Sequence, residues 1–264
     1  MRANRYFPYV NNRIYTPPDA LIPNYTALLN VLGIQRAILV QPSIYGNDNS
    51  ALLHALATNP KDFRGVGVVD PIISDNALID MHSKGVRGLR FNVVDLAKKK
   101  GELPFAVLKD LSKRVAPLNW HLELLVHANE FPEMAQNLGQ LHTPIVLGHL
   151  GYVSAEHTLK NRGFQNLLSM VRAGHAWVKL TGPYRISQSP TPPYHDVTPF
   201  AQALLNANPN RLLWGTDWPH VMVKGEMPND ATLLNLLFDW IPNPADQEKI
   251  FVKNPAALYG FVEE

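Results

Sequence analysis

The 264-residue sequence predicts an α/β fold in which parallel strands alternate with helices. Seven apolar runs of strand length alternate with stretches of helical length, and this alternation indicates parallel strands joined by crossover helices. The runs are almost continuously apolar, which suits strands covered on both faces. Each run also stops at a polar residue or a proline. We therefore expect a TIM-like (β/α) barrel, with a flat doubly wound sheet as the architectural rival.

The predicted elements follow one another in a regular order. Residues 1–23 are rich in Pro, Tyr and Asn and are expected to form an extended arm. The predicted strands are 36–41, 64–69, 86–91, 120–126, 144–148, 176–180 and 211–216, and they end in turn at Pro42, Asp70, Asn92, His127, His149, Thr181 and Asp217. The predicted helices lie near 24–33, 48–59, 74–84, 104–116, 130–139, 160–173, 197–207, 230–240 and 244–252.

The strand count is one short of the eight that a complete barrel requires. No strand candidate precedes residue 24. Either the first strand is missing, or the N-terminal arm fills the gap between the last strand and the first one present. Because the chain has no internal repeat, low-complexity segment or linker, residues 1–264 are predicted to form a single domain.

The composition excludes several classes of protein and site. A net charge of +2 with 17% charged residues provides no basic stripe for nucleic acid or an anionic membrane. Cysteine is absent, which excludes disulfides, thiolate nucleophiles and Cys-ligated zinc. No apolar run approaches the ~20 residues that span a bilayer, and no signal-peptide core is present. A soluble, cytoplasmic protein is expected.

Asp217 ends the last apolar run, in the stretch Trp214-Gly215-Thr216-Asp217-Trp218-Pro219-His220. Because Pro219 prevents the strand from continuing in a paired sheet, Asp217 is expected at the C-terminal tip of the strand. In a barrel of parallel strands that tip faces the active site. Asp217 is therefore the first candidate catalytic residue, and the alternative is an Asp that only caps the next turn.

Seven segments, taken together and in order, carry a family resemblance. They are Phe7-Pro8-Tyr9, Arg13-Ile14-Tyr15-Thr16-Pro17-Pro18-Asp19-Ala20, Gln41-Pro42-Ser43, Gly88-Leu89-Arg90-Phe91-Asn92, Gly148-His149-Leu150-Gly151, Lys179-Leu180-Thr181-Gly182-Pro183-Tyr184-Arg185 and Trp214-Gly215-Thr216-Asp217-Trp218-Pro219-His220. This set resembles the amidohydrolase superfamily (amidohydrolase 2 type), and within it the 2-pyrone-4,6-dicarboxylate hydrolase-like branch. The resemblance implies a TIM-like barrel that hydrolyses or isomerises lactones of acidic sugars or aromatic-degradation intermediates, in several cases without a required metal.

The chain departs from the resembled family at three places. Family members carry His-x-His at the end of the first strand, and the absence of this motif suggests a truncated or variant protein. A second Arg usually follows the Arg-Phe-Asn segment, where this chain offers only Lys98, and the Arg usually seen shortly after Gly-His is replaced by Tyr152. Two missing cations favour a lactone that is less charged than the dicarboxylate.

Lactone hydrolysis requires an activated water, a polarised carbonyl group and cations that hold the substrate's carboxylates. Asp217 is predicted to be the general base, and His149 is predicted to polarise the carbonyl or orient the water. The alternative for His149 is a core histidine bonded to a backbone carbonyl. Arg90 and Arg185 also lie at strand ends and match a carboxylate bidentately, or else they form structural ion pairs.

Tyr15, Ser43 and His220 are further candidates for substrate binding. Tyr15 matches a substrate-contacting Tyr of the resembled family by its place in Tyr-Thr-Pro-Pro. Ser43 ends a strand with a hydroxyl group, and His220 follows Asp217 in the same loop. Arm packing and turn formation are comparable alternatives for Tyr15 and Ser43. The role of His127, which also ends a strand, stays open.

Three function classes follow from these residues. The first is a hydrolase that opens an anionic lactone with Asp217 as base and without a cofactor. The second is a metal-dependent decarboxylase or amidohydrolase of the same superfamily, with a divalent ion such as zinc at His149 and Asp217, although two ligands make a poor site. The third is a catalytically impaired binding protein, because His-x-His is absent. The expected partner is a small anionic substrate, and homo-oligomerisation stays open.

Overall fold

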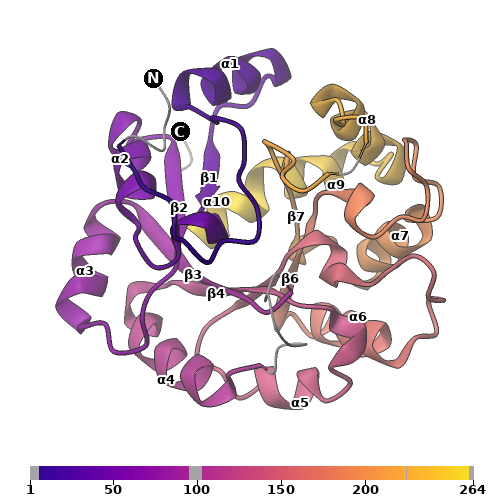
Figure 1. Ribbon diagram of the computed structural model, residues 1–264. Coiled ribbons are helices and arrows are strands. Elements are labelled where there is room, and N and C mark those ends of the chain that lie inside the picture. The colour runs from indigo at the N-terminus through magenta and orange to yellow at the C-terminus, as the bar shows by residue number, and fades with distance from the viewer. Residues whose placement is uncertain (1–5, 95–102, 224, 262–264) are drawn as a thin grey trace. The chain divides into compact units, whose positions relative to one another are not determined.

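The computed structural model describes residues 6–94, 103–223 and 225–261. Seven strands form one sheet in the order β1-β2-β3-β4-β5-β6-β7, so neighbours in the sheet are neighbours in sequence (Figure 1). The strands are β1 Ala37–Val40, β2 Phe63–Gly67, β3 Val86–Asn92, β4 His121–Leu125, β5 Ile145–Leu147, β6 Ala176–Leu180 and β7 Leu212–Trp214. The prediction of seven strands is confirmed, with every strand end within two residues of its predicted place.

Helices alternate with the strands, as predicted. They are α1 Ile22–Leu32, α2 Ser50–Thr58, α3 Asp75–Ser83, α4 Phe105–Val115, α5 Met134–Leu138, α6 Arg162–Arg172, α7 Thr198–Ala207, α8 Asp230–Trp240, α9 Pro244–Glu248 and α10 Asn254–Tyr259. The helix predicted near 130–139 is much shorter, because Phe131 precedes Pro132 and lies outside the helical region at φ −120° and ψ 70°. The helix predicted at 244–252 continues through the π-helical segment η8, Lys249–Lys253, into α10.

The chain divides into two compact units, Met1–Glu123 and Leu124–Glu264, with the boundary inside β4. In the first unit β1, β2 and β3 pair in parallel. Helices α2 and α3 lie along one side of these strands (Figure 1), and their fully or nearly buried side chains are Leu52, Leu56, Leu78 and Met81. The assignment of residues 1–264 to a single domain stays a prediction.

The N-terminal arm forms no strand within residues 6–21. Instead it lies over η2, the 3-10 turn Ser43–Tyr45 that follows β1. The backbone N–H of Val10 donates to the carbonyl of Ile44 at 2.8 Å, and the rings of Tyr9 and Tyr45 meet edge to face at 5.3 Å between centroids. The arm therefore does not replace the first strand of a barrel within the part of the chain that is described.

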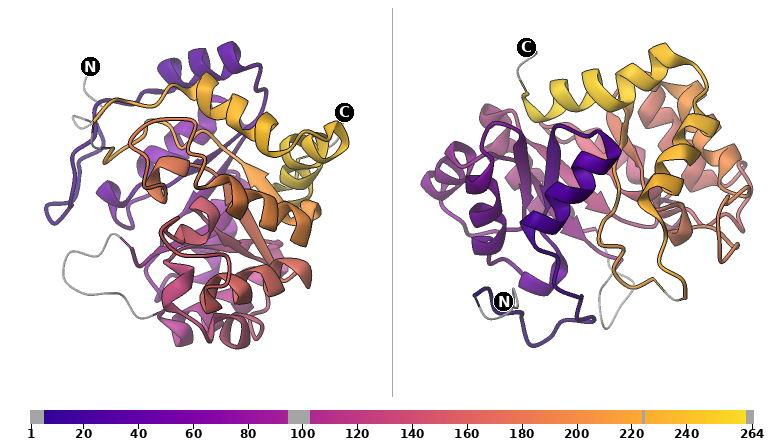
Figure 2. Two further views of the ribbon diagram at one scale, coloured as in Figure 1. Left: turned by 90° about the vertical axis from the view of Figure 1, so that its right-hand side faces the viewer. Right: turned by 90° about the horizontal axis from the view of Figure 1, so that it is seen from above.

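In the second unit β5, β6 and β7 pair in parallel, with Lys179 opposite Leu213. The side-chain amide of Asn254, at the start of α10, donates to the carbonyls of Leu212 at 2.7 Å and Pro209 at 2.8 Å. Figure 2 shows the C-terminal helices as an almost continuous coil that ends at α10. These bonds anchor β7, the strand that leads to Asp217, to the last helices of the chain.

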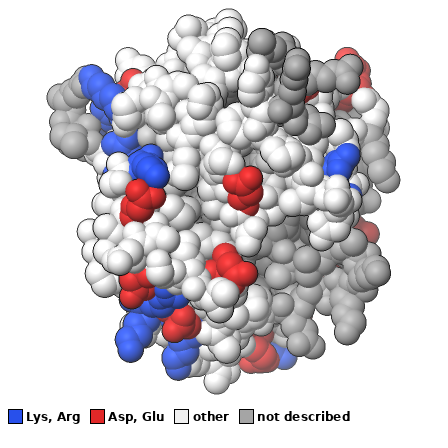
Figure 3. All heavy atoms as spheres, turned by 60° about the vertical axis from the view of Figure 1, so that its left-hand side comes forward, with Lys and Arg blue, Asp and Glu red and all other residues white. Residues whose placement is uncertain are grey.

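Charged side chains of both signs lie close together on the face drawn in Figure 3. In the first unit Lys84 pairs with Asp80 at 2.8 Å and Arg114 with Asp75 at 2.7 Å. Exposed pairs of this kind contribute about 0–1 kcal/mol each to stability, so they shape the surface more than they hold the fold. No helix within the described ranges is long and apolar enough to cross a bilayer.

Gly88 on β3 allows the buried ring of His121 on β4 to approach the backbone. A Cβ atom at Gly88 would lie 2.6 Å from His121 Nε2, and His121 is fully buried. We expect Gly88→Ala to lower the free energy of unfolding by about 1–3 kcal/mol, the usual cost of overpacking a core. Urea unfolding of the variant measures this. In a His121→Ala background the same substitution should cost less, and an equal cost would contradict the steric explanation.

Candidate active site

Asp217 and His149 lie in the loops that follow two strands of the second unit, and both have unusual backbone conformations. Asp217 follows β7 with a φ of +61°, and His149 follows β5 with a φ of +48°. Left-handed backbone is uncommon for residues other than glycine, although Asp and His enter it more readily than most. Thr216 holds the loop by accepting a hydrogen bond from the N–H of Trp218 at 3.1 Å. Both residues thus lie just beyond the C-terminal ends of strands.

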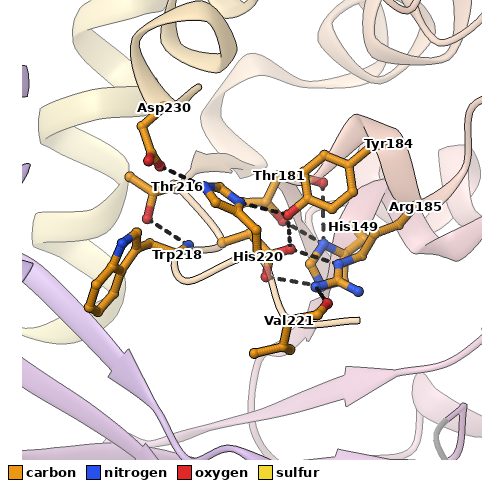
Figure 4. Close-up of polar contacts among 10 residues, drawn as sticks. His149, Thr181, Tyr184, Arg185, Thr216, Trp218, His220, Val221 and Asp230 are labelled. Carbon is orange, nitrogen blue, oxygen red and sulfur yellow. Dashed lines mark hydrogen bonds and ion pairs between the residues drawn. The ribbon is translucent and has the colours of Figure 1, made fainter. Parts of the chain in front are cut away.

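The two oxygens of the Asp217 carboxylate have different neighbours. Oδ2 accepts a hydrogen bond from the Tyr184 hydroxyl at 2.6 Å and another from Arg185 Nε at 2.6 Å. Oδ1 lies 3.7 Å from Nε2 of His149. Tyr184 and Arg185 belong to η6, Pro183–Arg185, which follows β6. Figure 4 shows the labelled side chains of Tyr184, Arg185 and His149 gathered around one point. One oxygen is thus saturated with donors while the other faces an imidazole.

The tautomer of His149 follows from its neighbour Thr181. Nδ1 of His149 lies 3.0 Å from the Thr181 hydroxyl and 3.3 Å from the Thr181 carbonyl oxygen. Since a carbonyl oxygen only accepts, we infer that Nδ1 carries the hydrogen and that Nε2 keeps its lone pair. His149 Nε2 and Asp217 Oδ1 are therefore two hydrogen-bond acceptors that face each other.

Gly182 leaves space for the side chains of Asp217 and His149. A Cβ atom at this position would lie 2.9 Å from Asp217 Oδ2 and 2.9 Å from His149 Nδ1, and the backbone of Gly182 has a φ of +56°. Both the space and the backbone conformation favour glycine here. The backbone at residue 182 is thus part of the wall of the site.

Electrostatics keep Asp217 ionised and His149 neutral. Burial opposes the charge of Asp217, but His149, Arg185 and the Tyr184 hydroxyl together hold the pKa of its carboxyl below the usual value of 3.8. Burial lowers the pKa of His149 below 6.5 and outweighs the attraction of Asp217. Burial also opposes the charge of Arg185, yet Asp217 raises the pKa of that guanidinium. At neutral pH the site therefore contains a carboxylate, a guanidinium and an uncharged imidazole.

Residues behind Asp217 extend the hydrogen-bonded network. His220 is only 2% exposed, and its Nδ1 lies 2.9 Å from the Tyr184 hydroxyl oxygen while its Nε2 lies 3.0 Å from Asp230 Oδ1. Both ring nitrogens of His220 thus contact other side chains of the protein, and its role as a substrate ligand stays a prediction. Sequence reasoning assigned no role to Tyr184 or Asp230. The motif that contains Tyr184 was a usable signal, whereas Asp230 looks like an ordinary acidic residue in the first turn of α8.

Three predicted substrate ligands lie in the first unit. Arg90 donates from Nη1 to the carbonyl of Gln41 at 2.8 Å, and the Ser43 hydroxyl accepts from the Asn92 amide at 2.9 Å. These contacts link the C-terminal ends of β1 and β3 and bring Ser43 near Arg90. Tyr15 lies half-buried in the arm. Their roles as substrate ligands stay predictions.

The structure brings four predicted residues together in the second unit, namely His149, Arg185, Asp217 and His220. Arg185 donates a hydrogen bond from Nε to Asp217, and another from Nη2 to the carbonyl of Val221 at 3.2 Å. His127 contacts the carbonyl of Tyr152 through Nδ1 at 3.0 Å, and the Tyr152 ring meets the His149 ring edge to face. Lys98 lies outside the described residues.

The donors at this site do not suit a divalent metal ion. Among the described residues, His149 and Asp217 are joined by no third His, Asp or Glu in a group that could hold one. The Arg185 guanidinium also occupies Asp217 Oδ2, and a fixed positive charge there opposes a second cation. Two candidate ligands beside a guanidinium fit a zinc ion poorly, and the expectation of a reaction without a cofactor stays a prediction.

Comparison with known proteins covers nearly the whole chain. The family model described as "Amidohydrolase" matches residues 2–261. The 4-sulfomuconolactone hydrolase of Hydrogenophaga intermedia is 37% identical over 259 residues, which are 97% of this chain and 84% of that protein. The 2-pyrone-4,6-dicarboxylate hydrolase of Comamonas testosteroni is 34% identical over 261 residues, which are 96% of this chain and 85% of that protein.

A solved structure provides an independent comparison of the fold. The crystal structure of a probable 2-pyrone-4,6-dicarboxylic acid hydrolase from Acinetobacter baumannii, with citric acid bound, has a TM-score of 0.84 and 24% sequence identity. The match covers 99% of this chain and 96% of that one. At this identity the likeness concerns the fold alone, and it confirms the predicted TIM-like α/β class.

Proposed function

Because the chain belongs to the amidohydrolase family, we propose that it is a hydrolase that opens an anionic lactone by attack of water, with Asp217 as the general base. The observation that carries the proposal is the pair of acceptors, Asp217 Oδ1 and His149 Nε2, which lie 3.7 Å apart. A water oxygen about 2.8 Å from both atoms would direct one hydrogen to each of them. Its remaining lone pairs would then point toward a bound carbonyl group.

The reaction follows from this placement of the water. The water oxygen attacks the lactone carbonyl carbon while one of its protons passes to Asp217 Oδ1. The tetrahedral intermediate then collapses, the ring C–O bond breaks, and the leaving oxygen takes the proton back from Asp217. The products are one carboxylic acid and one hydroxyl group, so the atoms of lactone and water are all accounted for. His149 orients the water through Nε2, and Tyr184 and Arg185 hold Oδ2 so that Oδ1 faces the water.

The charge of the substrate follows from the cations and from the relatives. Arg185 uses Nε and Nη2 within the protein, so its Nη1 is the group we propose for a substrate anion. The roles in substrate binding that the sequence predicts for Arg90, Ser43 and Tyr15, in the first unit, stay predictions. Both named relatives carry a lactone or pyrone with an acidic group in their names. We therefore propose a lactone with at least one carboxylate or sulfonate.

The test is an assay of ring opening with a panel of lactones. The panel holds lactones with a carboxylate or a sulfonate and, as the matched control, an uncharged lactone with the same ring. We expect turnover of acidic lactones only, and the same rate with and without a chelator. Loss of the rate in chelator, restored by added metal, would favour the metal-dependent alternative. Equal turnover of the uncharged lactone would contradict the proposed anion site.

The acid limb of the kcat/KM profile should reflect protonation of His149. Protonated His149 would turn Nε2 into a donor and pair it with Asp217, so both acceptors for the water would be lost. Because burial lowers the pKa of His149 below 6.5, kcat/KM should stay level down to that pH and fall only at lower pH. The pKa of Asp217 lies below 3.8, so its carboxylate stays ionised above that pH. An acid limb that persists unchanged in His149→Gln would show that another group causes it.

A further inference from the structure

A chain of polar contacts leads from helix α8 to Asp217. Asp230 Oδ1, in the first turn of α8, lies 3.0 Å from His220 Nε2. His220 Nδ1 lies 2.9 Å from the Tyr184 oxygen, and the Tyr184 hydroxyl donates to Asp217 Oδ2 at 2.6 Å. Figure 4 shows the labelled side chains of Asp230, His220 and Tyr184 in this order. Three short contacts thus join two carboxylates through an imidazole and a phenol.

The hydrogens needed for these contacts can be counted. A carboxylate accepts only, so the contact with Asp230 needs a hydrogen on His220 Nε2. The single hydroxyl hydrogen of Tyr184 is required by Asp217, because the two oxygens are 2.6 Å apart. Burial and Asp217 raise the pKa of Tyr184, so its hydroxyl keeps that hydrogen. The remaining contact, between His220 Nδ1 and the Tyr184 oxygen, then needs a second hydrogen on the imidazole.

We propose that Asp230 holds His220 as a doubly protonated imidazolium, and that His220 in turn keeps the Tyr184 hydrogen directed at Asp217 Oδ2. The charged groups near His220 are then balanced, with Asp217 and Asp230 opposite Arg185 and His220. His220 and Asp230 are positioning residues, since they act on the reacting water only through Tyr184 and Asp217. The catalytic consequence rests on the proposed function, whereas the protonation of His220 does not.

The protonation state of His220 decides which hydrogen bond the Tyr184 hydroxyl makes. A neutral His220 with its hydrogen on Nε2 would present a lone pair from Nδ1 to Tyr184. The Tyr184 hydroxyl would then turn toward His220, and Asp217 Oδ2 would keep only Arg185 as a donor. Asp217 could rotate about its last bond, and Oδ1 would no longer be held toward the water. Asp230 thus decides which way the Tyr184 hydroxyl points.

The first test reads the imidazole directly and needs no substrate. Nitrogen NMR of protein labelled in its histidines separates an imidazolium from either neutral tautomer, and His220→Gln identifies the signal. We expect the imidazolium pattern for His220 at neutral pH, and a neutral pattern in Asp230→Asn. The matched control is Asp239→Asn, an exposed Asp on the same helix, which should leave the signal unchanged. A neutral His220 in the unaltered protein would overturn the proposal.

The second test measures coupling along the chain of contacts. Asp230→Asn should lower kcat about tenfold, the scale of one weakened hydrogen bond, with little change in KM. In a Tyr184→Phe background, Asp230→Asn should cause no further loss, because the hydroxyl on which it acts is absent. If the two substitutions lower kcat by independent factors that multiply, Asp230 does not act through the Tyr184 hydroxyl, and the proposal is overturned. If no lactone is turned over, the proposed function fails, and the NMR result still decides the state of His220.

Discussion

Replacing Asp217 with Asn should lower kcat ~10²–10⁴-fold, the usual loss when a general base is removed. Asn keeps the shape of the side chain, but its oxygen is a much weaker proton acceptor than a carboxylate oxygen. The amide also presents an NH₂ group either to Arg185 or to the water, which disturbs the donors now on Oδ2. Steady-state kinetics on the best acidic lactone measures the effect.

A matched control for this substitution is Asp70→Asn. Asp70 also follows a strand, β2, but it is exposed and its Oδ1 accepts the N–H of Ile72 at 3.0 Å, so it serves as a turn cap. We expect the Asp70 variant to keep turnover near that of the unaltered protein. Binding of the lactone to the Asp217 variant should weaken far less than turnover, because Arg185 remains. Retained turnover in Asp217→Asn would refute the assignment of the base.

Gly182→Ala should be nearly as damaging, with a loss of about 10²-fold in kcat/KM from displaced reacting groups. The new methyl group would meet Asp217 Oδ2 and His149 Nδ1, each at 2.9 Å, so one or both must move. The φ of +56° adds backbone strain for alanine. Kinetics together with thermal unfolding separates a displaced site from an unfolded protein.

Gly33→Ala is a control for backbone strain, as distinct from collision of the new methyl group with neighbouring side chains. Gly33 caps α1 with a φ of +69°, and no atom lies within 4 Å of the place where a Cβ would stand. The substitution therefore imposes the backbone strain without a collision, and activity should survive. Full activity of Gly182→Ala would show that Asp217 and His149 can move without loss of turnover. This result would contradict a water molecule held between Asp217 Oδ1 and His149 Nε2.

Local patterns in the sequence were sufficient to predict the elements that carry the site. Apolar runs that end at polar residues located all seven strands, because burial on both faces leaves a clear mark on composition. The same ends made Asp217 and His149 candidate site residues, since a polar residue at the end of a buried apolar run is conspicuous. The helix near residue 131 was overestimated because the effect of Pro132 on its preceding residue was not weighed.

The partners of the site residues could not be predicted in the same way. Tyr184 and Asp217 are 33 residues apart, and His149 and Thr181 are 32 apart, so their contacts depend on the pairing and register of strands. Arg185 was expected to hold substrate, and its bond to Asp217 is a feature of three-dimensional packing. The role of Gly182 likewise depends on two side chains that come from other loops.

Ring opening in water enriched in heavy oxygen tests the central claim most directly. If water adds to the lactone carbonyl with Asp217 as base, each turnover places one heavy oxygen in the new carboxylate and none in the released hydroxyl group. The product is measured by mass spectrometry with fragmentation, after a single turnover to limit later exchange. A product that has formed at the enzyme's rate without heavy oxygen would show isomerisation in place of hydrolysis, and would contradict the proposed reaction.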